Sequence, residues 1–241
     1  MNQTPTPDTG KPDVDLDYHL SALGQRALQQ LMQVWFDFER QLGRVPIVAR
    51  IDQQQLSRED YLKLLLHLRQ QVIEGGRWIS RCASSFERDY ADVRSTVIGH
   101  AQAEHQDYQM LEQDYLAAGG ELNLLHAQGR NIGTEALHAF LMYRASQPNP
   151  VELIGAMWII EGLGQKMAGS WADAVDRLFG TDPSCSQFMR YHALNDDGHM
   201  DKLYRLIDRV CQTEAQLKAV VKTARVVSRL YALQLEEIDH D

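Results

Sequence analysis

Two histidines and one aspartate stand at helical spacing in the run YHALNDDGHMDKL. His192, Asp196 and His199 occupy positions i, i+4 and i+7, so on a helix they share one face. Apolar Phe188 and Leu203 continue the same face, which indicates that it is turned toward the core. Buried imidazoles and carboxylates are unfavourable unless they are paired or bind a metal. Two histidines and one carboxylate are also a ligand set that suits non-haem iron.

A second segment places ionisable residues in the middle of an apolar stripe. His100, Glu104 and Asp107 lie between Val97 and Leu111 at spacings that share one helical face. This segment is the less specific of the two, because the run HAQAEHQDYQ is polar on several sides and also fits a solvated helix surface. These residues become stronger candidates for metal ligands only when they are considered together with the groups on other helices.

Glu161 is the third feature, in the run GAMWIIEGLG. Apolar or small residues surround this carboxylate on every side, and an ionised glutamate there needs a cation. A buried arginine would satisfy it, and so would a metal. Gly155, Gly162 and Gly164 would let a second helix or a ligand approach closely. Since three helices each offer His or acidic groups to the interior, the pattern favours a metal site of the kind that helical bundles build.

Simpler interpretations apply to the remaining histidines. A single core histidine is more often a hydrogen-bonded structural residue than a ligand. Glu135 and His138 form an E-x-x-H pair, which di-iron bundles use, but their helix is short and this choice leaves His192 and Glu161 unexplained. We therefore rank that pair below the main hypothesis. Four further histidines are assigned to surface or loop positions: His19, His67, His126 and His240.

The elements that must position these groups are helices. The hydrophobic periodicity predicts about seven of them and no strand. The expected ranges are 20–42, 57–82, 86–118, 134–146, 150–180, 184–211 and 213 onward. Ser57 with Asp60 and Thr213 with Gln216 form capping-box signatures. The run VPIVARI is short enough to enter the core without a regular helix, and 120–133 is predicted to be a long connection. Residues 1–16 are polar and Pro-rich, which predicts a disordered leader before a single helical domain at 17–241.

Composition excludes several classes of protein. The net charge of −9 and the pI near 5.4 argue against nucleic acid or an anionic membrane as a partner. No apolar run reaches transmembrane length, and the N-terminus has no signal-peptide pattern. Three widely spaced cysteines form no C-x-x-C motif, which predicts a reduced, cytoplasmic protein without a zinc site.

At this level of detail the chain resembles the haem-oxygenase-like superfamily. The resemblance is to the branch that holds the thiaminase-like (TenA-like) proteins, the pyrroloquinoline-quinone synthase and the haem-oxygenase-like di-iron oxidases. It is strongest to the di-iron oxidases, also described as iron-containing redox enzymes. The resemblance covers about 30–210 and includes GHAQAEHQDYQMLEQDYLAAGG, IGAMWIIEGLG and YHALNDDGHMDKL. It implies an all-α, haem-oxygenase-like bundle. The most specific part is the H-x-x-x-D-x-x-H motif of the di-iron branch, which is matched by His192, Asp196 and His199.

The same resemblance implies the rest of a ligand set. Glu161 matches the family's glutamate on the middle helix, and Glu104 matches the glutamate of the first metal helix. The family's next ligand is a histidine three or seven residues further on, where this chain has Asp107 and Leu111. Asp107, or His100 one turn earlier, would have to take its place. The first iron position is therefore where this chain departs from its relatives.

The implied function is a non-haem iron oxidase or oxygenase that uses O₂ on a small organic substrate. It is a di-iron enzyme, with two Fe per chain, if both positions fill. The resemblance assigns no separate catalytic residue, and we expect a homodimer. The alternative is a metal-free small-molecule-binding or TenA-like protein on the same fold. Thiaminase-like hydrolases need a nucleophilic cysteine near the pocket, and none of the three cysteines lies in a matching motif. A true haem oxygenase needs a histidine on the first helix, which His19 precedes.

Overall fold

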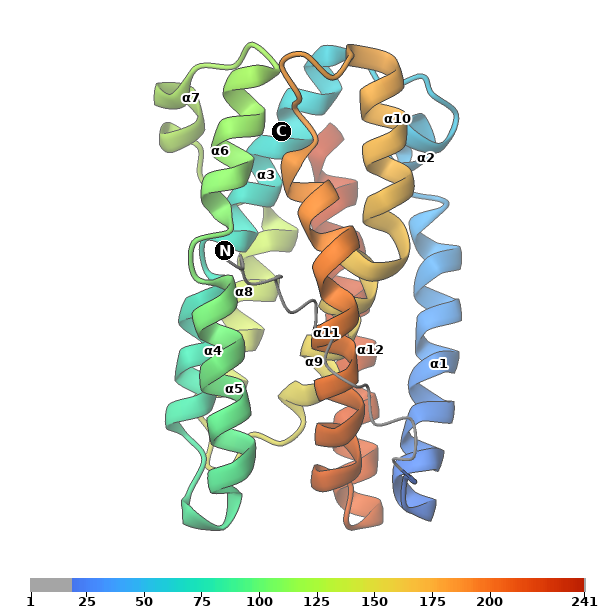
Figure 1. Ribbon diagram of the computed structural model, residues 1–241, viewed down its shortest axis with the longest axis vertical. Coiled ribbons are helices and arrows are strands. Elements are labelled where there is room, and N and C mark those ends of the chain that lie inside the picture. Colours follow the sequence, from blue (N-terminus) through green and yellow to red (C-terminus); the bar gives the residue numbers. More distant parts are fainter. Residues whose placement is uncertain (1–18, 241) are drawn as a thin grey trace, which may run out of the picture.

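The structure is a computed structural model that describes residues 19–240, with the backbone alone at 195–199. Its helices run roughly along the long axis of the molecule, and α11 extends over much of its length (Figure 1). Over the described residues the chain forms helices and no strand, which confirms the predicted all-α class. The predicted leader at 1–16 lies outside the described residues. A single domain over 17–241 stays a prediction.

Each of the seven predicted helices is found, but three of them are divided. The range 57–82 holds α3 and α4, the range 86–118 holds α5 and α6, and the range 150–180 holds α9, a π-helical segment and α10. Two short helices, α2 and α7, occupy VPIVARI and the predicted connection. The bounds are α1 Ala22–Leu42, α2 Pro46–Asp52, α3 Arg58–Val72, α4 Gly75–Ser84, α5 Ala91–Glu104, α6 Tyr108–Ala117, α7 Leu122–Ala127, α8 Ile132–Ala145, α9 Leu153–Leu163, η2 Gly164–Ala168, α10 Gly169–Phe179, α11 Gln187–Val210 and α12 Glu214–Glu236, with 3₁₀ turns η1 Arg88–Tyr90 and η3 Glu237–Asp239.

Helix starts follow the predicted caps. The Ser57 hydroxyl accepts from the Asp60 amide at 3.0 Å, and the Asp60 carboxylate accepts from the Ser57 amide at 3.1 Å, which forms a capping box for α3. The Thr213 hydroxyl accepts from the Gln216 amide at 3.2 Å and caps α12. These local bonds satisfy amides that no helical carbonyl can reach.

The division of α5 from α6 positions one of the candidate ligands. Residues 105–107 form a turn between the two helices, and Asp107 stands directly before α6. At this turn α4 approaches so closely that a Cβ on Gly76 would lie 2.7 Å from the Cβ of His105. Glycine at position 76 is therefore required for the contact. No glycine or proline stands at 105–107 itself, so the sequence carries no signal for this break.

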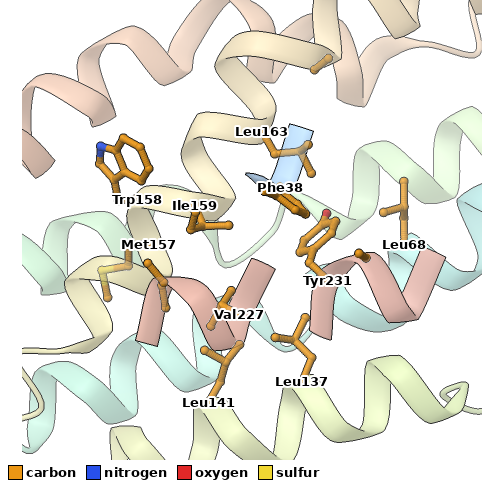
Figure 2. Packing of buried hydrophobic residues seen from close by; sticks show 14 of the residues in the cluster. Phe38, Leu68, Leu137, Leu141, Met157, Trp158, Ile159, Leu163, Val227 and Tyr231 are labelled. Atoms are coloured by element: carbon orange, nitrogen blue, oxygen red, sulfur yellow. The ribbon is translucent and has the colours of Figure 1, made fainter. Parts of the chain in front are cut away.

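Helix α9 is buried on nearly all sides and forms the centre of the core. In Figure 2, Met157 and Ile159 lie toward α12, which carries Val227, while Trp158 projects from another side of α9. Trp158 makes an edge contact with Trp35 of α1, with ring centroids 6.5 Å apart. A Cβ on Gly155 would lie 2.3 Å from the Val220 carbonyl oxygen, which confirms the predicted close approach of a second helix. The packing fixes α9, and with it Glu161, firmly inside the bundle.

None of the described helices combines the length and the apolar character that crossing a membrane would require.

Candidate metal centre

Five ionisable side chains from four elements lie together inside the bundle. His100 and Glu104 come from the last turns of α5, Asp107 from the turn before α6, Glu161 from α9 and His192 from α11. His100 Nε2 lies 3.2 Å from Glu161 Oε1, and His192 Nε2 lies 3.4 Å from Asp107 Oδ2. The side chains are well buried, since His100 is 8% exposed and Glu161 is 4% exposed.

These residues form two overlapping groups. In the first, His100, Glu104 and Glu161 offer ligand atoms that all lie within 4.8 Å of one another. In the second, Glu104, Asp107 and His192 do the same. Glu104 belongs to both groups. A carboxylate has two oxygens and four lone-pair positions, so a single glutamate in this place is able to bind two cations at once.

Burial disfavours charge on Glu104. Desolvation, together with repulsion from the neighbouring Glu161, raises the pKa of Glu104 to about 7, and His100 and His192 oppose the shift only in part. Asp107 Oδ2 is buried and accepts no hydrogen bond from any described residue, although His192 Nε2 lies 3.4 Å away. A concentration of buried carboxylates is costly in the interior unless donors or a cation balance their charge.

The donor set fits iron. Imidazole nitrogens and carboxylate oxygens together are the ligands of non-haem Fe(II), whereas a structural zinc site would use thiolates or more histidines. The three cysteines are all free and buried, and none belongs to either group. The buried carboxylate oxygen of Asp107 that receives no hydrogen bond is the kind of atom a metal ion would satisfy.

A cavity of about 90 Å³ adjoins this cluster. His100, Glu104, Glu161 and His192 form part of its wall, and the rest is mainly apolar. The apolar wall comes from several helices: Leu68, Val72, Trp78, Ile79, Met157, Ile160, Leu163, Ala168, Trp171, Phe188 and Met189. A small molecule therefore has a mainly apolar space beside the candidate ligands.

Comparison with known proteins places the chain in a family. The sequence profile of a family described as iron-containing redox enzymes, haem-oxygenase-like, matches residues 95–232. This range holds all the candidate ligands. The chain belongs to the family of iron-containing redox enzymes. A search of curated proteins finds no match for it.

Solved structures show that this chain shares its fold with several other proteins. A domain of unknown function with a heme oxygenase-like fold from Shewanella denitrificans OS217 superposes with a TM-score of 0.82 at 18% identity, over 88% of this chain and 92% of that one. A TenA homolog from Pseudomonas syringae pv. tomato str. DC3000 gives 0.74 at 12% identity, over 93% and 99%. A TenA homologue from P. horikoshii OT3 gives 0.67 at 14% identity, over 90% and 97%. The fold predicted from the resemblance is therefore confirmed.

The structure brings together most of the residues that the sequence singled out. His100, Glu104, Asp107, Glu161 and His192 converge as described above. Both His100 and Asp107 lie beside Glu104. Which of them takes the place of the histidine that the resemblance implies stays a prediction. Asp196 and His199 lie within α11, but their side chains are outside the described residues, and their roles stay predictions.

The lower-ranked E-x-x-H pair lies apart from the cluster. Glu135 pairs with Arg130 at 3.2 Å, and His138 Nδ1 lies 3.8 Å from Glu74. Neither residue belongs to the two groups of candidate ligands among the described residues. The assignment of His67 to the surface was wrong, because it is 5% exposed and its Nδ1 lies 3.4 Å from the Asn131 amide nitrogen. Its place on the buried side of α3, beside Leu64 and Leu68, was the signal that should have been used.

Glu161→Gln should stabilise the metal-free protein. The substitution removes one of three neighbouring buried carboxylates, and about 1 kcal/mol or more is expected at pH 8. The folded-state pKa of Glu104 is raised to about 7, so ionising Glu104 costs stability as the pH rises through this value, in part through Glu161. The gain from Glu161→Gln should thus be larger at pH 8 than at pH 6. Thermal melts of the apo proteins measure it, with the exposed Glu135→Gln as a control. A large loss of stability would instead indicate a buried cationic partner for Glu161.

Proposed function

We propose that this iron-containing redox enzyme uses iron at the centre formed around Glu104 to oxidise a small organic substrate with O₂. The observation that carries the proposal is the position of Glu104 in both groups of ligand atoms, each within 4.8 Å. Carboxylates and histidines that converge from several helices are how helical bundles hold a pair of iron ions. When bound, the iron supplies activation of O₂ and the oxidising chemistry.

The protein's own residues would hold and shield this centre. His100 and Glu161 would bind one iron position, Asp107 and His192 the other, and Glu104 would bind both. In the sequence-based hypothesis Asp196 and His199 complete the second position. The apolar wall of the cavity excludes water and holds the substrate beside the ligands. Fixed helices position the ligands, since α9 is buried on nearly all sides.

The iron content of the purified protein tests this proposal. Protein from iron-supplemented cells, or apo protein titrated anaerobically with Fe(II), should hold about two iron ions per chain if both positions fill. His192→Ala should lower the content, while His138→Ala, a half-buried histidine outside the cluster, should leave it unchanged. Near-zero iron in the wild type, with no gain on Fe(II) addition, would contradict the proposal and support a metal-free small-molecule binder.

A thiaminase-like hydrolase is the second candidate, because two TenA homologues share the fold. The cysteines argue against it. Burial raises the pKa of the Cys211 thiol to about 12 and that of the Cys82 thiol further, so neither is a ready nucleophile. Cys185 is also buried, and none of the three lines the cavity. A homodimer and a cytoplasmic location stay predictions, and light scattering of the purified protein tests the first.

A further inference from the structure

The wall of the cavity beside the candidate metal centre has a second polar site, formed by Gln71 of α3 and Tyr231 of α12. Both side chains line the cavity and both are buried, Gln71 being 9% and Tyr231 5% exposed. The Tyr231 hydroxyl donates a hydrogen bond to Gln71 Oε1 at 3.4 Å. Tyr231 is itself packed edge-on against Phe38, with ring centroids 6.2 Å apart, and Figure 2 shows the two rings side by side. The tyrosine therefore orients the amide of Gln71.

This arrangement leaves the amide nitrogen of Gln71 without a hydrogen-bond acceptor among the described residues. Its oxygen is used by Tyr231, and no described carbonyl or carboxylate receives its N–H groups. The Gln71 side chain is largely buried, and its amide carries two donors that can bind an acceptor at the cavity wall. Because Gln71 lines the cavity, an acceptor oxygen on a bound molecule is able to fill that role.

Away from the candidate ligands, the described residues of the cavity wall provide no side chain of opposite charge for a charged group on a bound molecule. No lysine or arginine is among the described residues that line the cavity. Lys166, on the neighbouring π-helical segment, is exposed and lies over the Trp35 ring at 5.9 Å. The apolar wall is formed by residues such as Trp78, Ile79, Met157, Leu163 and Phe188. A carboxylate or an ammonium group held there would lose its water without gaining a partner.

We propose that the cavity takes an uncharged, largely apolar substrate, and that Gln71 binds its one carbonyl or hydroxyl oxygen. Gln71 is then a specificity-determining residue, and Tyr231 is a positioning residue that holds the amide toward the cavity. This inference rests on the proposed function, because it treats the cavity as the substrate site of the iron centre. It adds the class of substrate, which neither the family nor the ligand set assigns.

A substitution at Gly75 should fill part of the cavity without changing any candidate metal ligand. Gly75 lines the same cavity at the start of α4, and a Cβ placed on it would meet no atom within 4 Å. A larger side chain at this position therefore enters open space instead of displacing protein atoms. Gly75→Leu should fill part of the cavity and leave His100, Glu104 and Glu161 in place.

The test uses three probes of equal chain length: 1-hexanol, hexanoate and hexylamine. Their binding to anaerobic Fe(II)-loaded protein is measured by calorimetry. Wild type should bind hexanol at least about tenfold more tightly than either charged probe. Gln71→Leu should weaken hexanol binding about tenfold, as expected for one lost hydrogen bond, and Tyr231→Phe should weaken it less. Gly75→Leu should abolish it. Gln53→Leu, at an exposed position, is the matched control and should change nothing.

Iron content and thermal melts of the same samples separate the two proposals. Gln71→Leu that keeps its iron and its fold but loses hexanol binding supports the inference. Hexanoate binding as tight as hexanol, or hexanol binding unchanged in Gln71→Leu, overturns it. If the wild type holds no iron, that result counts against the proposed function alone. If hexanol binding to this iron-free protein is still weakened by Gln71→Leu and Gly75→Leu, the inference of an uncharged ligand is supported.

Discussion

Glu104→Gln should remove iron from both positions of the candidate centre. Glu104 is common to the two groups of ligand atoms, so one substitution affects both, whereas Asp107→Asn or His100→Ala affects one group each. An amide lacks the negative charge and has one acceptor oxygen in place of two. Even residues that only support a ligand alter metal affinity 10- to 100-fold, so we expect a loss of at least about 100-fold here. Anaerobic Fe(II) titration with metal analysis measures it.

The design includes controls for fold and for charge. Glu135→Gln makes the same chemical change on an exposed side chain of α8 and should retain the wild-type iron content. The circular dichroism spectrum of Glu104→Gln should stay that of a helical protein. The substitution removes a carboxyl whose pKa burial raises, so it should not destabilise the fold. Two tightly bound iron ions in Glu104→Gln would show that Glu104 does not bridge, and one remaining ion would place Glu104 at a single position.

The residues predicted best from the sequence are those whose position depends on local periodicity. The α11 face is an example: Leu203 and Leu206 are buried, Phe188 packs against His192 with ring centroids 4.4 Å apart, and His192 reaches the cluster. A helical period of 3.6 residues fixes which side chains share a face without knowledge of the rest of the chain. The same holds for Glu161, whose apolar neighbours on every side already indicated a buried helix.

Features that depend on contacts between distant segments could not be predicted. The turn at 105–107 is formed where α4 packs against α5, and no residue in the turn marks it. The pairing of Gln71 with Tyr231 joins α3 to α12 across 160 positions of sequence. Each residue alone looks like any other position on an amphipathic helix. Only the packing of the two helices shows that they form a polar site in the cavity wall.

Asp114 was also missed, and it holds the start of the helix that carries His192. Its two carboxylate oxygens accept from the backbone amides of Gln187 and Phe188, each at 2.9 Å. These are the first amides of α11, which have no carbonyl of their own helix to bind. Ser186, the residue before α11, instead donates its hydroxyl to Asp176 at 2.6 Å. Asp114 of α6 thus caps α11 from a different helix, and it is fully buried.

Asp114→Ala should therefore destabilise the protein by about 2 to 4 kcal/mol, because two partly buried amides at a helix start lose their acceptors. At about 2 to 4 °C per kcal/mol, a fall in Tm of several degrees or more is expected. Burial raises the folded-state pKa of Asp114 to about 6, although the hydrogen bonds from the two amides lower it. A raised folded-state pKa means that the contribution of Asp114 to stability is greatest below about pH 4 and falls as the pH rises through 6. The loss caused by Asp114→Ala should accordingly be larger at pH 5 than at pH 7.5.

Thermal melts of the apo proteins at the two pH values measure this effect. Asp37→Ala is the control, since the Asp37 side chain is 69% exposed and its pair with Arg40 is at the surface. Because Phe188 lines the cavity and contacts His192, loosening the first turn of α11 should also weaken Fe(II) binding while the other ligands remain in place. Unchanged stability in Asp114→Ala would mean that water replaces the carboxylate at these amides and that the start of α11 is held by its packing alone.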